Sequence, residues 1–337
     1  MADEFTEAAL GKPIRDLGLT IAGTPLESIV DALMQEVVAA GIRRLRPRFY
    51  LSTEWGVPQD TIAVAMPFYL AHPELTELHV RRAGHLEGLD AADILRYLRH
   101  EMGHVVLYAY KLHTDERWTP LFGRFDKRYR EEYRPKPFSR KFVRHLPGWY
   151  AQKHPEEDWA ETFAVWLTPG SDWRTEYADW PTALAKLTYC DEVMRRVGDL
   201  EPLVTDEDRD EDVGDISYTL GEFYRDYEDD PDEEALPRGI DGALRDVFAG
   251  LAPRPGGGQA FAAALLRRLE RELTAQVYRW TGHFPERTRA LVRRLARRAE
   301  ELALAYGPEH ETAAVVAVTA LVAALATTHV TRGRYDP

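Results

Sequence analysis

The 337-residue chain has a single cysteine, Cys190, which excludes an intrachain disulfide and any zinc site built from several cysteines. It also lacks an excess of positive charge. Its formal net charge of −13 argues against general nucleic-acid binding. The length and the 45% share of hydrophobic residues are sufficient for two domains and a sizeable core. We therefore expect a soluble globular protein without a disulfide framework.

Residues 1–10 are acidic and lack the basic and then apolar pattern of a secretory signal peptide, so we expect a cytoplasmic protein. Long apolar runs are also rare, and only residues 312–330 approach the length of a membrane span. This run is rich in Ala, Thr and Val and has no flanking basic cluster or aromatic belt. The pattern favours a buried central helix of a small bundle over insertion into a membrane.

The most informative pattern lies at residues 100–104, where the sequence reads HEMGH. On a helix, His100 and His104 are four residues apart and face the same side, so both imidazoles can bind one zinc ion. Glu101 lies beside them and can reach a metal-bound water as a general base. A structural zinc site would not need such a base.

The segment around this pattern has the features of a long helix. Asp90 is a suitable N-cap, and Asp93 three residues later resembles a capping box. Residues 91–111 contain no proline, and their apolar residues recur at helical spacing. We therefore predict a helix that buries one face and presents the two histidines across a cleft.

A second predicted helix begins at Pro155 and ends at Leu167, before a Thr-Pro-Gly turn. Glu157 and Glu161 are four residues apart and share one face of it. One of these carboxylates can bind zinc while the other orients a ligand histidine. His113 is the next histidine after the HEMGH segment, but its spacing fits no zinc pattern.

The HExxH pattern followed by E-x-x-A-E resembles the gluzincin class of zinc peptidases. The resemblance implies that Glu157 is the third ligand of one Zn²⁺ ion and that Glu161 supports the site. Asp158, which lies off the face of Glu161, is the alternative ligand. A longer similarity is to bacterial proteins described as "putative zinc-binding metallopeptidases". It is carried by LRHEMGH, YAQKHPEEDWAETFAVWL and the upstream segments FYLSTEWGVP and PFYLAHPEL, and it covers roughly residues 46–197.

Tyr150 precedes Glu157 by seven residues, which completes the pattern Y-x(6)-E-x-x-A-E. This pattern resembles the catalytic domain of anthrax lethal factor and the Pro-Pro endopeptidases, with a similarity confined to the motifs. It implies that the Tyr150 hydroxyl stabilises the oxyanion of the reaction, and a packed aromatic residue is the alternative. His154 can either contribute to the same pocket or cap the helix that begins at Pro155.

Positive charge is concentrated between the two motifs, where residues 111–145 contain 11 Lys and Arg but 5 Asp and Glu, interleaved with aromatic residues. This segment should border the cleft. It can recognise an acidic group or the C-terminal carboxylate of a peptide, or it can be a solvated insertion with an aromatic underside.

The segment before the first motif indicates strands at Arg48–Ser52 and Thr61–Leu70, a short one at residues 78–80, and a helix at residues 25–40.

After residue 199 the chain has acidic runs, and helices are expected near 240–251, 259–280, 286–306 and 309–330. We predict an α+β fold with a zincin-like metallopeptidase domain at 1–200, an acidic linker at 201–238 and an all-α accessory domain at 239–337.

The favoured function is a zinc-dependent peptidase that hydrolyses peptide bonds with a metal-activated water and Glu101 as general base. Its partners would be a peptide or protein substrate and, through the C-terminal helices, another protein. The alternatives are a zinc-containing binding or regulatory protein with little or no turnover, and an adaptor that acts through the C-terminal helices. Peptide turnover that depends on Glu101 would separate the first function from the others.

Overall fold

The computed structural model describes residues 8–129, 133–136, 138–228, 236–237, 239–254 and 256–336. The chain forms two compact units. The first comprises residues 1–81 and 86–226, and the second comprises residues 82–85 and 227–337. Each unit is described by itself below.

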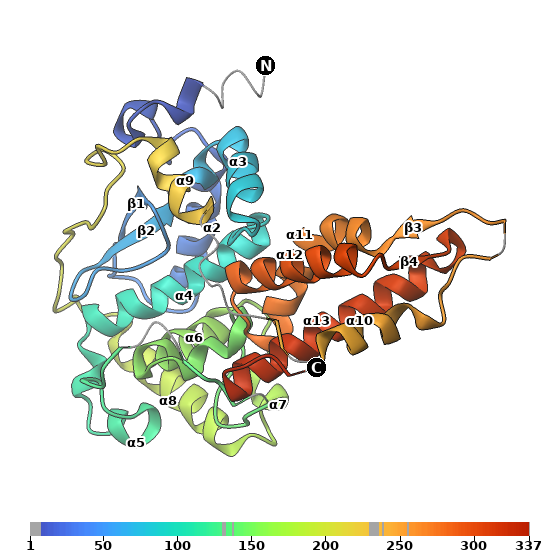
Figure 1. Cartoon of the computed structure of the whole chain (residues 1–337). Coiled ribbons are helices and arrows are strands. Elements are labelled where there is room, and N and C mark those ends of the chain that lie inside the picture. Colours follow the sequence, from blue (N-terminus) through green and yellow to red (C-terminus); the bar gives the residue numbers. More distant parts are fainter. Residues whose placement is uncertain are drawn as a thin grey trace. The chain divides into compact units, whose positions relative to one another are not determined.

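The first unit is mainly helical and contains one small parallel sheet (Figure 1). Its elements in chain order are η1 (Ile14–Leu17), α2 (Pro25–Ala39), β1 (Arg48–Ser52), β2 (Ala63–Pro67), η2 (Phe68–Ala71), α3 (Pro73–Ala83), α4 (Ala91–Ala109), η3 (Leu112–Thr114), α5 (Trp118–Phe122), η4 (Pro147–Gln152), α6 (Pro155–Leu167), α7 (Trp173–Glu176), α8 (Pro181–Val197) and α9 (Leu220–Glu228). The helices predicted from the two zinc motifs are confirmed as α4 and α6.

The two strands are parallel, with Arg48 opposite Ala63 and Ser52 opposite Pro67. The first predicted strand is confirmed with its bounds. The second is shorter than predicted because the chain turns into η2 after Pro67. The short strand predicted at residues 78–80 is wrong, since these residues lie inside α3. A short apolar run does not distinguish a strand from a helix, and here Pro73 in the first helical turn decides for the helix.

Helix α4 lies at the centre of the first unit, between the β1–β2 sheet and the helices α6 and α8 (Figure 1). Its contact with α6 is unusually close, because a Cβ atom on Gly103 would lie 2.6 Å from the Cα atom of Ala160. The indole N–H of Trp159 donates a 2.8 Å hydrogen bond to the Gly103 carbonyl and ties the two helices together at this point. The second motif is thereby held directly against the first.

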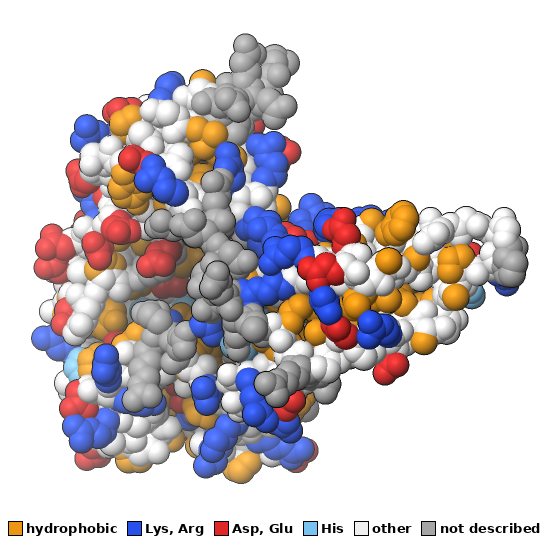
Figure 2. Space-filling model, in the orientation of Figure 1, with side chains coloured by type: hydrophobic (Ala, Val, Ile, Leu, Met, Phe, Trp, Pro, Cys, Tyr) orange, Lys and Arg blue, Asp and Glu red, His pale blue; other side chains and the backbone are white. Residues whose placement is uncertain are grey.

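The acidic run at residues 206–212, which we expected to be part of a solvated linker, lies against the sheet. The backbone N–H of Ile62 donates to the Asp206 carbonyl, and that of Val213 donates to the Leu51 carbonyl. The Tyr50 hydroxyl donates to the Asp210 carbonyl at 3.0 Å. Figure 2 shows acidic side chains gathered over this part of the surface. The run is therefore attached to the first unit, while the predicted domain boundaries themselves stay predictions.

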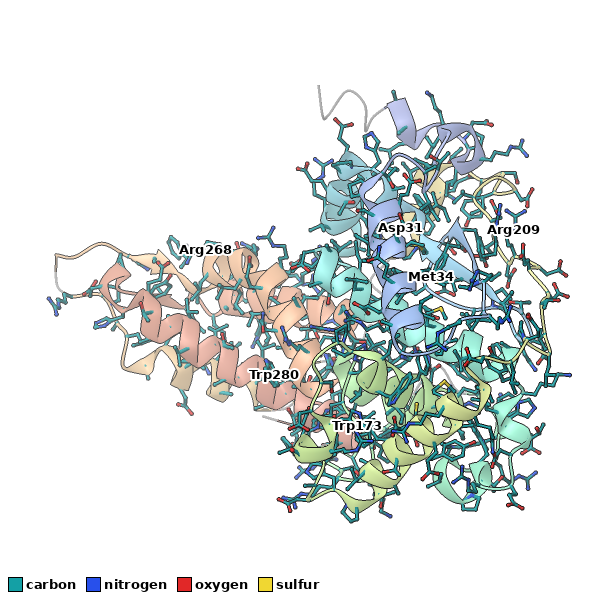
Figure 3. The ribbon with its side chains drawn as sticks, turned by 180° about the vertical axis from the view of Figure 1, so that it is seen from behind. Asp31, Met34, Trp173, Arg209, Arg268 and Trp280 are labelled. Atoms are coloured by element: carbon teal, nitrogen blue, oxygen red, sulfur yellow. The ribbon has the colours of Figure 1, made fainter. Side chains whose placement is uncertain are left out.

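The second unit consists of helices and one short antiparallel strand pair. Its elements are α10 (Ile240–Ala249), β3 (Ala260–Phe261), α11 (Ala262–Thr281), α12 (Pro285–Glu301), β4 (Ala305–Tyr306), η5 (Pro308–His310) and α13 (Glu311–Arg332). The four predicted helices are confirmed with ends shifted by a few residues. Arginines of α12 pair with acidic residues of this unit, as Arg298 does with Asp241. In contrast, Trp280 of α11 is 70% exposed (Figure 3).

Helix α13 is not the fully buried central helix that we predicted. One face is buried in the core of the second unit, formed by Ala314, Val318, Val322, Leu325 and Ala326. The opposite face is exposed and includes Val316, which is 64% exposed. By length and composition alone, residues 308–332 could cross a membrane, which is weak evidence for a span.

We expect Gly103→Ala to destabilise the first unit, although alanine favours helix formation. The added Cβ meets backbone atoms of Ala160, and such overpacking typically costs about 1–3 kcal/mol. Gly242, a helical glycine of α10, has open space at its Cβ position and provides the control. Gly242→Ala should stabilise the protein by up to about 1 kcal/mol. Thermal melting decides, and a Gly103→Ala protein as stable as the wild type would contradict the close packing.

Candidate metal centre

Two aspartates bind backbone N–H groups at the start of helix α4, which carries the first motif. The Asp90 carboxylate accepts a 2.9 Å hydrogen bond from the backbone N–H of Asp93. The Asp93 carboxylate in turn accepts from the N–H groups of Gly88 and Leu89. The predicted N-cap is confirmed, but the capping box is not complete, because Asp93 accepts from residues 88 and 89 and not from the N–H of Asp90. Three buried residues of the motif follow on this helix, His100, Glu101 and His104, and the two histidines face Glu157 of α6.

Helix α6 begins with His154 as its N-cap and Pro155 in its first turn. Nδ1 of His154 accepts a 3.3 Å hydrogen bond from the backbone N–H of Glu156, and Nε2 lies 2.7 Å from the Lys127 carbonyl. These two contacts identify Nδ1 as the acceptor and Nε2 as the donor. Of the two alternatives that we considered for His154, the structure supports the helix cap.

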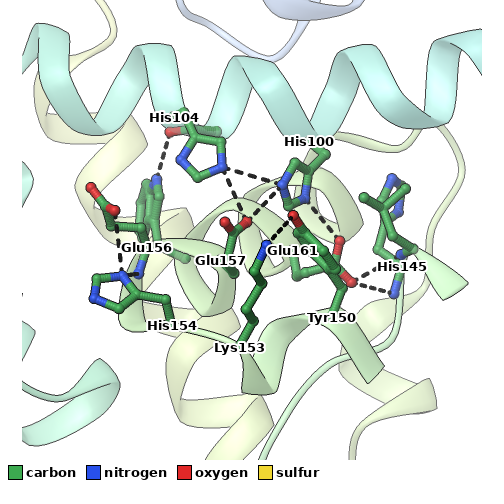
Figure 4. Close-up of polar contacts among 12 residues, drawn as sticks. His100, His104, His145, Tyr150, Lys153, His154, Glu156, Glu157 and Glu161 are labelled. Atoms are coloured by element: carbon green, nitrogen blue, oxygen red, sulfur yellow. Dashed lines mark hydrogen bonds and ion pairs between the residues drawn. The ribbon is translucent and has the colours of Figure 1, made fainter. Parts of the chain in front are cut away.

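His100, His104 and Glu157 converge with their nitrogen and oxygen atoms on one point (Figure 4). The two Nε2 atoms are 3.2 Å apart. Oε2 of Glu157 lies 3.0 Å from Nε2 of His100 and 3.3 Å from Nε2 of His104. The structure therefore brings together the three residues that the sequence suggested as ligands, and all three are buried.

These separations fit a zinc ion. Zinc with bonds of about 2.05 Å in tetrahedral geometry holds its ligand atoms about 3.3 Å apart. The three atoms observed here are mutually 3.0–3.3 Å apart, which is the spacing of three corners of such a tetrahedron. The donor set of two imidazoles and one carboxylate is also one that zinc accepts while keeping a fourth position open.

The electrostatics of the three groups favour a cation at this point. Burial disfavours the charged form of His100, but hydrogen bonds to Glu157 and Glu161 outweigh it and raise its pKa to about 10. For Glu157, burial is outweighed by the two histidines, which lower its pKa well below the ordinary value. The imidazoles therefore attract protons in the absence of a metal, and a metal ion that binds here must displace them.

Glu101 is 5% exposed and lies close enough to His100, His104 and Glu157 to interact with their charges. Burial raises the pKa of its carboxyl group, while the two histidines act in the opposite direction. A carboxylate with a raised pKa is a stronger base than an ordinary glutamate, which suits a group that accepts a proton from water.

Glu161 supports His100 from the side opposite to Glu157. Its Oε1 atom lies 2.9 Å from Nδ1 of His100, and its Oε2 atom accepts hydrogen bonds from the backbone N–H groups of His145 and Leu146. A carboxylate with these contacts fixes the ring orientation of a metal-binding histidine and leaves Nε2 for the metal.

Asp158, the alternative third ligand, faces away from the histidines. Its Oδ2 atom forms a 2.5 Å ion pair with Nζ of Lys186, a fully buried residue of α8. Burial raises the pKa of Asp158 to about 7, and Lys186 opposes this shift. Among the described residues, Asp158 Oδ1 has no hydrogen-bond partner. The pair anchors α6 to α8, and Asp158 does not contribute to the His100–His104–Glu157 cluster.

Tyr150 lies next to the cluster at the end of a constrained turn. Its ring centroid is 5.4 Å from that of His100, and Nζ of Lys153 lies 3.4 Å from its hydroxyl oxygen (Figure 4). The preceding residue, Trp149, has a left-handed backbone with φ of 61°, which is rare for a bulky side chain. Arg144 stacks on the Trp149 ring at 4.2 Å and helps to hold this turn.

The basic segment at residues 111–145 borders the centre at two points. The Tyr129 hydroxyl donates a 2.6 Å hydrogen bond to Oε1 of Glu157, and the N–H of His145 binds Glu161. His113 does not take part, because its ring stacks on Phe125. Residues 130–132 and 137 lie outside the described residues. The contact of Tyr129 was missed, since the sequence marks it only as one aromatic residue among several.

Comparison with known proteins agrees with the chemistry of this cluster. No curated protein and no solved structure matches the chain. The part of the chain that carries the cluster, residues 90–180, matches the model of a protein family described as "Putative zinc-binding metallo-peptidase".

Proposed function

We propose that this protein is a zinc-dependent peptidase of the gluzincin type, with a zincin-like first unit. The observation that supports it most is the convergence of His100, His104 and Glu157 at the separations of a zinc site, with Glu101 buried beside them. The family match at residues 90–180 supports a zinc-dependent peptidase independently of this geometry. His100, His104 and Glu157 would hold the ion, and Glu161 would orient His100.

When bound, zinc would lower the pKa of a coordinated water to about 7 and act as a Lewis acid. Glu101 accepts the proton that the attacking water loses and delivers it to the amine that leaves when the peptide bond breaks. Both transfers need a carboxyl group that gains and loses a proton readily, and burial raises the pKa of Glu101 above its ordinary value.

Tyr150 supplies the second part of the proposed reaction. Attack on a peptide carbonyl places negative charge on its oxygen, and a hydroxyl group aimed at that oxygen stabilises the charge as it forms. Burial raises the pKa of Tyr150 well above its ordinary value, so the hydroxyl keeps its proton for donation. Lys153, at 3.4 Å from the Tyr150 oxygen, adds a positive charge to the same side of the centre.

The alternative is a zinc-containing binding or regulatory protein on a peptidase-like scaffold. A protein of that kind needs the ligands and Glu161 but gains nothing from a buried Glu101. Burial disfavours the charged form of Glu101 and raises its pKa, so placing a carboxyl group here costs free energy. This cost favours the peptidase over the binding protein.

Glu101→Gln should abolish peptide hydrolysis and leave zinc bound. Removal of a general base typically lowers the rate by about 10²-fold or more, and the amide fills nearly the same space. Zinc content by elemental analysis and turnover of a peptide library provide the two measurements. Turnover equal to that of the wild type, in a protein that retains zinc, would rule out the assigned role.

Glu157→Ala should remove or severely weaken zinc binding, whereas Glu161→Ala should weaken it by about 10–100-fold. The first change deletes a metal-binding oxygen, and the second deletes only the partner of His100 Nδ1. Asp158→Asn is a matched control on the same helix, expected to lower the melting temperature without a specific loss of zinc affinity. If Glu157→Ala binds zinc as tightly as the wild type in a metal titration, the third ligand is misassigned.

Tyr150→Phe should lower kcat by about 10–1000-fold and leave KM nearly unchanged, as expected for the loss of an oxyanion donor. Zinc content and melting temperature should stay near the wild-type values because the ring remains in place. Steady-state kinetics with a cleaved peptide test this expectation. A normal kcat together with a lower melting temperature would identify Tyr150 as a structural aromatic residue.

A further inference from the structure

Tyr129 reaches the candidate metal centre from outside the two motif helices. Its hydroxyl donates to Oε1 of Glu157 at 2.6 Å, whereas Oε2 of the same carboxylate faces the two histidines. Tyr129 is 40% exposed, while Glu157 is buried. Water could satisfy the hydroxyl of an exposed tyrosine, so the contact matters mainly for the buried carboxylate.

The backbone next to Tyr129 is fixed to the start of α6. Nε2 of His154 donates a 2.7 Å hydrogen bond to the Lys127 carbonyl, two residues before Tyr129. The Tyr129 ring lies against the His154 ring, with a centroid distance of 5.2 Å. His154 is also the N-cap of α6, the helix that carries Glu157. One residue therefore sets both the beginning of the helix and the approach of the tyrosine to its carboxylate.

We propose that Tyr129 is a positioning residue that holds Glu157 in a one-oxygen binding mode. A carboxylate can bind a metal ion through one oxygen or through both. The hydrogen bond from Tyr129 engages Oε1 and leaves Oε2 directed at the point where His100 and His104 converge. This inference rests on the proposed function, because it gives Tyr129 a role only if Glu157 binds the metal.

One-oxygen binding matters for the open position of the site. Two imidazoles and one carboxylate oxygen occupy three of the four positions of tetrahedral zinc, which leaves the fourth for water or substrate. If Glu157 bound through both oxygens, the second oxygen would compete for that space. Tyr129 binds one oxygen of Glu157, and Glu161 binds one nitrogen of His100. In each case the other atom, Oε2 or Nε2, would be left to bind the metal.

Tyr129 also influences the proposed oxyanion residue, because it is one of the groups that raise the pKa of Tyr150. Replacement of Tyr129 can therefore affect turnover through Tyr150 as well as through Glu157. Metal binding separates the two effects, since Tyr150 is not among the proposed ligands. The experiment consequently measures the metal site itself.

The test compares the full-length wild type with Tyr129→Phe and with Tyr108→Phe. Tyr108 is a matched control because its hydroxyl donates a 2.9 Å hydrogen bond to Glu156, the neighbour of Glu157 that is not a proposed ligand. Two quantities are measured: the zinc dissociation constant by competition with a chelator, and the visible absorption of the Co²⁺-loaded protein. The Co²⁺ bands weaken when coordination rises from four to five, so they report how many oxygens Glu157 contributes.

Tyr129→Phe should weaken zinc binding by about 10–100-fold, because Glu157 loses the hydrogen bond that orients it. It should also weaken the Co²⁺ bands, because the freed Oε1 atom can then contact the metal. Tyr108→Phe should match the wild type in both measurements. A Tyr129→Phe protein with wild-type affinity and spectrum overturns this inference alone, as does an equal loss in both variants. A wild type that binds neither ion overturns the proposed function as well. Thermal melting verifies that each variant is folded.

Discussion

The close contact between α4 and α6 is the constraint on which the candidate metal centre depends. Gly103 has no side chain, and Ala160 opposite it is small, so the two backbones meet where any larger residue would separate them. At this separation His100 lies within hydrogen-bond distance of both Glu157 and Glu161. Gly103 of the first motif and Ala160 of the second therefore allow this close packing, although neither is a candidate metal ligand.

The contact between α4 and α6 also places several carboxylates in the interior. Each of them needs hydrogen bonds or an opposite charge to offset the free energy of its burial. Glu161 receives two backbone N–H groups and the His100 ring, and Asp158 receives the ammonium group of Lys186. Glu157 is bound by two imidazoles, and its pKa falls. Burial raises the pKa of Glu101, as it raises that of Asp158, although His100 and His104 oppose the shift at Glu101. A buried carboxyl group with a raised pKa beside two histidines and a third carboxylate agrees with the proton transfer that we propose for Glu101.

The sequence predicted the parts of this arrangement that depend on spacing along a helix. Residues four apart share a face, so the histidine pair and the glutamate pair could be assigned without a structure. It did not reveal Tyr129, whose contact with Glu157 joins residues 28 positions apart through an irregular segment. The sequence also did not predict that the acidic run at 206–212 lies against the sheet, because composition does not show whether backbone groups form hydrogen bonds with a strand. The exposed face of α13 was missed for a similar reason, since an apolar helix does not specify how many sides are covered.

The acidic start of α6 shows how one short run can serve three separate electrostatic tasks. Each residue turns a helix by about 100°, so consecutive side chains point to different neighbours. Glu156 accepts from the Tyr108 hydroxyl, Glu157 faces the two histidines, and Asp158 pairs with Lys186. The negative charges also favour the positive N-terminal end of the helix. An acidic first turn is common in helices. This one differs because its middle residue, Glu157, faces His100 and His104.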